Sequence, residues 1–155
     1  MHPVTCFKIY KGFTLVELVL VIVILGVISV TALPMLFSRT DFEQRGFFDE
    51  LLQATRYAQK LAVASNCDVQ VTLNSGDFAL AFLNTPHAHC ANAAISLPSK
   101  QPPYDAPSGV TLSAGTGTIT FHPSGLASAD RTVTVTGTSP LSFRVYAATG
   151  YVERQ

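Results

Sequence analysis

The chain has 155 residues, 48% of them hydrophobic, with ten acidic and ten basic residues. This length allows one small domain plus a membrane segment, and a net charge of zero argues against a general affinity for polyanions. The sequence contains no phosphate loop or dinucleotide fingerprint. Its C-terminal half has no spaced acid pair of the glycosidase kind. We therefore expect a protein that is not an enzyme and needs no cofactor.

The first twelve residues are basic and end in a glycine. They contain Lys8 and Lys11 but no acid, so the rest of the chain has eight basic and ten acidic residues. The apolar run Leu18–Leu33 comes next and is followed by Pro34. It lacks the small-residue cleavage site that ends a secretory signal. We expect residues 13–33 to be retained and to cross a membrane, since 21 helical residues reach about 31 Å. The two lysines predict a cytoplasmic N-terminus.

The stretch from Lys11 to Leu18, Lys-Gly-Phe-Thr-Leu-Val-Glu-Leu, resembles the processing motif of type IV prepilins and type II secretion pseudopilins. The resemblance implies that a prepilin peptidase cuts between Gly12 and Phe13 and N-methylates Phe13. The family's acidic residue falls on Glu17, and Pro34 matches the place where pilin helices commonly kink. The implied partners are the peptidase, inner-membrane lipid before assembly, and other pilin subunits of the same filament.

Glu17 has a chemical role that fits this resemblance. A carboxylate in a bilayer is costly, about 2.5–3.5 kcal/mol at a helix centre and less near an end. Cleavage would create a cationic amine on Phe13, one helical turn away, in the same subunit or in a neighbour. An ion pair is stronger at low dielectric, so Glu17 and Phe13 are expected to act in assembly. The alternative is a signal-anchor helix in which Glu17 is accidental.

Residues 34–66 predict an amphipathic helix that ends at Asn66 and continues into a globular domain. Residues 67–155 then predict short strands separated by Gly, Pro and Asn. The expected class is α+β, with a long N-terminal helix packed on one antiparallel sheet. The apolar positions of the helix are Phe42, Phe47, Phe48, Leu51, Leu52, Thr55, Ala58, Leu61 and Ala62. The expected strands are Asp68–Leu73, Phe78–Leu83, Val110–Ser113, Thr118–His122, Thr132–Thr136, Leu141–Ala147 and Tyr151–Glu153, with a further short strand over Ile95–Leu97 in the loop Asn84–Pro107.

A second resemblance lies in the C-terminal half. The pattern Ile119-Thr-Phe-His-Pro-Ser-Gly125, followed by Gly150-Tyr-Val152, is similar to minor pseudopilins related to type II secretion protein H and to FimT-like pilins. Two segments resemble the minor pilins of mannose-sensitive haemagglutinin (MSHA) pili. They are Thr31–Pro34, at the end of the apolar run, and Arg56–Cys67. This implies a minor pilin of an MSHA-like type IV pilus, placed in the inner membrane with a periplasmic C-terminal domain and later in an extracellular filament. The alternatives are a tip adhesin, a DNA-binding minor pilin and a type II secretion pseudopilin.

Cys67 and Cys90 are the pair that remains once a leader containing Cys6 is removed. Two cysteines in an exported chain favour a disulfide. The alternative is a metal site that adds His87 and His89, but the spacing matches no known zinc module, so we expect no metal.

Two weaker patterns complete the candidate sites. His122-Pro-Ser-Gly125 is expected to be a turn, since the context of a nucleophile elbow is missing. Tyr104, Tyr146 and Tyr151 would line a binding surface if they were exposed, and Arg131, Arg144 and Arg154 would form a DNA footprint if they clustered. DNA is the less favoured partner.

Overall fold

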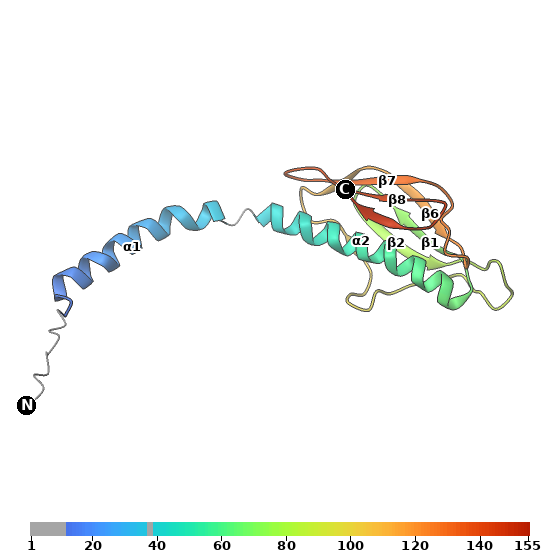
Figure 1. Cartoon of the computed structure of the whole chain (residues 1–155), viewed down its shortest axis with the longest axis horizontal. Coiled ribbons are helices and arrows are strands. Elements are labelled where there is room, and N and C mark those ends of the chain that lie inside the picture. The colour runs from blue at the N-terminus through green and yellow to red at the C-terminus, as the bar shows by residue number, and fades with distance from the viewer. Residues whose placement is uncertain (1–11, 37–38) are drawn as a thin grey trace, which may run out of the picture. The chain divides into compact units, whose positions relative to one another are not determined.

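The structure, a computed structural model, describes residues 12–36 and 39–155. The chain divides into two units, Met1–Ser38 and Arg39–Gln155. The first contains helix α1 (Leu15–Leu36), and the second begins with helix α2 (Arg39–Ser65), as labelled in Figure 1. The strands are β1 (Val69–Leu73), β2 (Asp77–Phe82), β3 (Ala93–Ala94), β4 (Tyr104–Asp105), β5 (Thr111–Ala114), β6 (Gly117–Phe121), β7 (Arg131–Thr136), β8 (Leu141–Val145) and β9 (Val152–Arg154).

Helix α1 is apolar on all sides. Every large apolar side chain from Leu15 to Ile28 is at least 43% exposed within the chain. The hydroxyl of Ser29 donates to the carbonyl of Leu25 at 2.6 Å, which satisfies this polar group inside the helix. A helix with no polar face needs lipid or other protein chains around it. In the part of the chain that the structure describes, no helix meets both the length and the hydropathy of a membrane span.

The predicted span over residues 13–33 therefore stays a prediction. The predicted kink at Pro34 also stays a prediction. Pro34 lies within α1, two residues before the helix ends at Leu36.

Helix α2 is amphipathic, as predicted, and buries one face. Phe42, which the pattern placed on that face, is instead 82% exposed, because it lies about 200° around the helix from the buried Gln44. The helix ends at Ser65 because Asn66 adopts a left-handed φ of 56°. The buried side chains are Gln44, Phe47, Phe48, Leu51, Leu52, Ala54, Thr55, Ala58 and Ala62.

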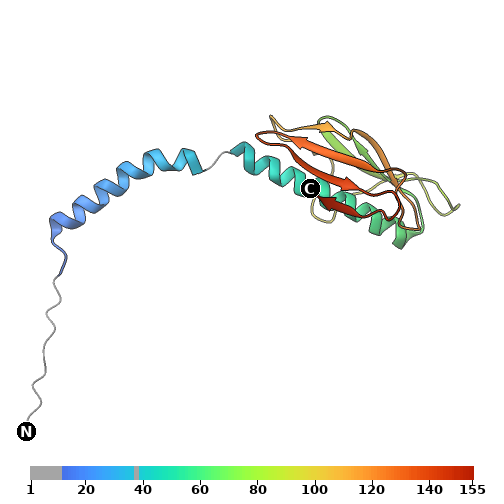
Figure 2. The same cartoon turned by 45° about the horizontal axis from the view of Figure 1, so that its top comes forward.

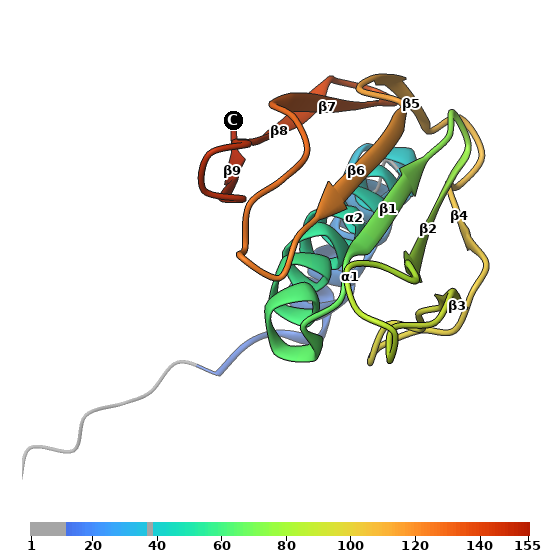
Figure 3. The same cartoon turned by 90° about the vertical axis from the view of Figure 1, so that its right-hand side faces the viewer.

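The strands form two antiparallel sheets rather than the single sheet predicted. Sheet one has the order β3-β2-β1-β6, with β4 also paired to β2, and sheet two has the order β5-β7-β8-β9. The C-terminal strands lie side by side in Figure 2, and Figure 3 shows α2 beneath both sheets. Both sheets turn apolar side chains inward, Val69, Val71, Ile119 and Phe121 from one and Val133, Val135, Phe143 and Val145 from the other. The α+β class is therefore confirmed.

The strand expected over Ile95–Leu97 is wrong. The short strands β3 and β4 lie on either side of this segment, which does not itself belong to a named strand. The amide of Leu97 donates to the hydroxyl of Tyr104 at 2.7 Å instead of entering a ladder. Pro98 follows and has no amide hydrogen to donate. Ile95 and Leu97 are nevertheless buried, so their apolar character serves the core.

Three polar side chains of α2 fix the position of sheet two. Arg56 donates to the carbonyl of Val152 at 3.0 Å. Gln59 donates to the carbonyls of Gly125 and Thr149, both at 3.0 Å. These bonds tie the helix to β9 and to two turns.

Gln44 is the third of these side chains and is 1% exposed. Its amide nitrogen donates to the carbonyls of Val135 and Ser139, and its oxygen accepts from the amide of Thr138 at 2.9 Å. A β-carbon on Gly137 would lie 2.6 Å from this oxygen, so any larger residue there would force the Gln44 side chain to shift. Gln44 thus holds the turn between β7 and β8.

We predict that Gln44→Leu lowers the free energy of unfolding by about 2–3 kcal/mol, because one buried carbonyl and two part-buried backbone groups lose their partner. The measurement is urea unfolding of the purified chain in detergent. Gln53→Leu, at an exposed position of the same helix, is the control and should change stability by less than about 0.5 kcal/mol. Equal stability of the two variants would contradict the role of Gln44.

Candidate functional site

The processing motif coincides with the start of α1. Thr14 is the N-cap residue: its hydroxyl accepts from the amide of Glu17 at 3.3 Å, and its carbonyl accepts from the amide of Leu18 at 3.2 Å. A threonine followed three residues later by glutamate is the capping-box spacing, and an acid in the first turn also favours the positive end of the helix dipole. Part of the motif is therefore an ordinary helix start.

Gly12 has no such local explanation. A β-carbon added to Gly12 would meet no atom within 4 Å, so the described structure does not require glycine there. Phe13 is 79% exposed, and Glu17 is exposed one turn further along. Except for Gly12, the predicted leader lies outside the described residues.

The disulfide between Cys67 and Cys90 is present, with 23 residues of separation. It joins the chain just after α2 to the loop that follows β2. The ring of His89 lies beside it, and the ligand atoms of Cys67, His89 and Cys90 lie within 4.8 Å of one another. His87 stacks on His89 with ring centroids 5.5 Å apart. In the disulfide both sulfurs are bonded to each other, so neither is available as a thiolate ligand.

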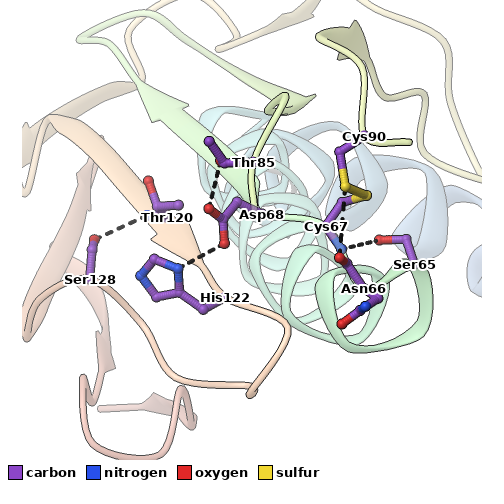
Figure 4. A network of polar contacts seen from close by, with 9 residues as sticks. All are labelled: Ser65, Asn66, Cys67, Asp68, Thr85, Cys90, Thr120, His122 and Ser128. Atoms are coloured by element: carbon purple, nitrogen blue, oxygen red, sulfur yellow. Dashed lines mark hydrogen bonds and ion pairs between the residues drawn. A yellow bond between two sulfur atoms is a disulfide. The ribbon is translucent and has the colours of Figure 1, made fainter. Parts of the chain in front are cut away.

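Asp68, directly after Cys67, connects this corner to sheet one (Figure 4). Its carboxylate accepts from the hydroxyl of Thr85 at 2.7 Å and lies 2.8 Å from Nδ1 of His122. Its backbone also exchanges bonds with the loop, from the Asp68 amide to Thr85 and from the Leu83 amide to Asp68, both 2.9 Å. Sequence analysis missed this network, because only the fold brings Asp68 and His122 together. Its two side-chain contacts and two backbone bonds all go to residues of the same fold, which indicates a structural junction.

The turn predicted at His122–Gly125 is confirmed by the bond from the amide of Gly125 to the carbonyl of His122, 2.8 Å. Tyr104 is 2% exposed and stacks on Phe78, with ring centroids 4.9 Å apart, so it cannot line a binding surface. Tyr146 and Tyr151 are stacked at the surface. The hydroxyl of Tyr146 donates to Glu153 at 2.6 Å, which raises the pKa of Tyr146.

The three arginines do not form a free basic patch. Arg131 donates to the carbonyl of Thr116 at 2.7 Å. Arg144 lies 3.7 Å from the carboxylate of Asp130, and Arg154 lies 3.1 Å from that of Asp49. Two of the three charges are therefore balanced locally, which weakens the case for DNA binding.

An apolar N-terminal helix that begins at the motif, followed by a helix packed on antiparallel sheets, defines a pilin-like subunit. Two family models match the chain. The prokaryotic N-terminal methylation motif matches residues 8–33, and the type II transport protein GspH matches residues 48–150, about two thirds of the chain. The chain therefore belongs to the GspH family, and it is a minor pilin or pseudopilin of a type IV pilus or a type II secretion system. The methylation motif implies a membrane-anchored pilin with a hydrophobic N-terminal helix.

Solved structures share this fold. The type IV minor pilin FimU of Pseudomonas aeruginosa is 13% identical with a TM-score of 0.56, over 74% of this chain and 90% of that one. The minor pseudopilin EpsH from the type 2 secretion system of Vibrio cholerae is 12% identical with a TM-score of 0.56, over 75% and 95%. These identities establish the fold alone. A comparison with curated protein sequences finds no significant match.

We predict that replacing Cys67 and Cys90 together by serine lowers the free energy of unfolding by about 3 kcal/mol, because the unfolded chain regains the entropy of an open loop. Wild-type protein reduced with dithiothreitol should unfold at the same denaturant concentration as the double variant. His89→Ala leaves the disulfide intact and should change stability by less than about 0.5 kcal/mol. A loss of stability from His89→Ala as large as that of the double variant would instead support the metal alternative.

Proposed function

We propose that the chain is a minor pilin of an MSHA-like type IV pilus, with a structural role in priming or assembling the filament. Residues 1–12 are the leader, 13–33 the membrane and assembly helix, 34–66 the helix that enters the globular domain, and 67–155 the β domain. The subunit waits in the inner membrane with a cytoplasmic N-terminus and a periplasmic C-terminal domain. Prepilin peptidase cuts between Gly12 and Phe13 and N-methylates Phe13, and the subunit then joins other pilins in the extracellular filament.

The observation that carries this proposal is the start of α1. A capped helix end presents one exposed carboxylate, Glu17, one turn after Phe13, and an exposed apolar helix follows. In a filament core the apolar surface would be covered by neighbouring helices. The new amine of Phe13 would then neutralise Glu17 of the same or an adjacent subunit, where an unpaired carboxylate is costly.

A GspH-like pseudopilin of a type II secretion system is equally supported, because it would use the same chemistry. The two candidates differ only in the machine that the subunit joins. Deleting the gene and scoring filaments, secretion, adhesion and DNA uptake divides the candidates. Loss of filaments with intact secretion supports the pilus. Loss of secretion supports the pseudopilin, and normal filaments with lost adhesion or DNA uptake support a tip adhesin or a DNA-binding pilin.

We predict that Gly12→Val blocks leader removal and that Gly12→Ala is processed in part. The physical reason is that the fold leaves space at Gly12, so the side chain is excluded by the peptidase alone. Mass spectrometry of membrane fractions measures the loss of residues 1–12 and the added methyl group. Gly26→Ala, also a site with open space, is the control and should be processed fully. Full processing of Gly12→Val would refute the assigned cleavage site.

We predict that Glu17→Val and Glu17→Gln both leave membrane insertion intact and reduce incorporation into filaments by at least about tenfold, because the amine of Phe13 loses its partner. Immunoblots of sheared filaments against total membranes measure the incorporated fraction. Thr14→Ala removes the helix cap, costs about 1 kcal/mol of local helix stability, and keeps the charge.

The Thr14→Ala chain should therefore assemble. If it fails as severely as Glu17→Gln, then helix capping, and not charge pairing, explains the motif. Normal incorporation of Glu17→Gln would overturn the charge-pairing role directly.

A further inference from the structure

A groove of about 680 Å³ lies in the second unit between the middle of α2 and the segment Leu97–Lys100. Its floor is mostly apolar: Ala54 and Leu97 are buried there, and the half-buried ring of Tyr57 and the exposed Pro98 line its side. Apolar side chains with a half-buried aromatic ring are typical of the centre of a protein interface.

The acids of this groove are already paired. Asp49 lies 3.1 Å from the guanidinium of Arg154, and Glu50 lies 3.3 Å from the ammonium of Lys100. Both pairs are partly exposed, so they add little to stability, but they cancel the negative charge at this end of the groove.

The remaining cations of the groove are not cancelled. Arg56 donates to the backbone carbonyl of Val152, which leaves its positive charge in place. Lys60 is exposed and lines the groove, and within residues 12–36 and 39–155 it makes no hydrogen bond or ion pair. The groove therefore combines an apolar floor with two uncompensated positive charges one turn apart on α2.

We propose that this groove binds a carboxylate-bearing apolar segment of another, different subunit of the same filament. The proposal rests on the proposed function, since it names the partner and the surface through which the β domain contacts its neighbour. Electrostatic complementarity selects the partner, and the apolar floor supplies the buried surface. Two cations over an apolar floor suit a protein segment with one or two acids better than a nucleic acid, which needs a longer basic track.

The test is site-specific photocrosslinking in intact cells with the full-length chain. Ser99, exposed at the rim of the groove, is replaced by p-benzoylphenylalanine, and adducts are identified by mass spectrometry. We expect an adduct with another pilin subunit. Thr132, exposed on the outward face of sheet two, carries the same probe as the control and should give no such adduct.

Two variants in the Ser99-probe background test charge and shape separately. Lys60→Glu should reduce the adduct by at least about fivefold, because it places a like charge before the partner's carboxylate. Gln53→Trp should reduce it similarly by filling the groove, without a change of charge. Arg45→Glu makes the same charge reversal at an exposed position of α2 outside the groove, and it should leave the adduct unchanged.

An adduct with a second copy of this chain or with lipid, an equal yield from Thr132, or an unchanged yield in both Lys60→Glu and Gln53→Trp would overturn the inference. If the chain enters sheared filaments and Ser99 gives no adduct, the inference fails and the proposed function stands. If the chain is absent from filaments, the proposed function fails and this inference fails with it.

Discussion

The apolar face of α2 is the surface on which the globular unit depends. Each sheet turns one row of apolar side chains inward, and a small sheet cannot bury such a face alone. Both sheets pack on the same helix, with Phe48 against Phe143 of sheet two and Phe47 against Phe78 of sheet one. Because apolar packing is non-directional, the position of sheet two is set by the directional bonds from Gln44, Arg56 and Gln59.

The two helices differ in how far their apolar side chains are covered. Helix α2 buries one face within its own unit, whereas α1 leaves its large apolar side chains from Leu15 to Ile28 exposed. In such a subunit, the unit that contains α2 folds around its own core. The apolar surface that remains to be covered lies on α1. That separation suits a GspH-family protein, since the surface left uncovered in the single chain is the surface available for assembly. Glu17 gives this uncovered helix a negative charge in its first turn.

The long connection after β2 has a structural role at both ends. The Cys67–Cys90 disulfide and the Asp68–Thr85 bonds fix its first part to the end of α2. The stacking of Tyr104 on Phe78 and the Tyr104–Leu97 bond fix its last part. Between them, Leu97–Lys100 is held against α2, which creates the groove. A segment that composition alone marks as a loop thus forms one wall of the groove, and α2 forms the other.

The sequence by itself determined the amphipathic helix that ends at Asn66, the strands over Asp68–Leu73 and Phe78–Leu83, and the cysteine pair. These follow from local periodicity, capping and turn chemistry, which depend on neighbouring residues. Only the tertiary structure decided the division into two sheets, the Asp68–His122 contact and the groove between α2 and Leu97–Lys100. Each of these features joins residues that are distant in sequence. Local periodicity carries no information about such contacts.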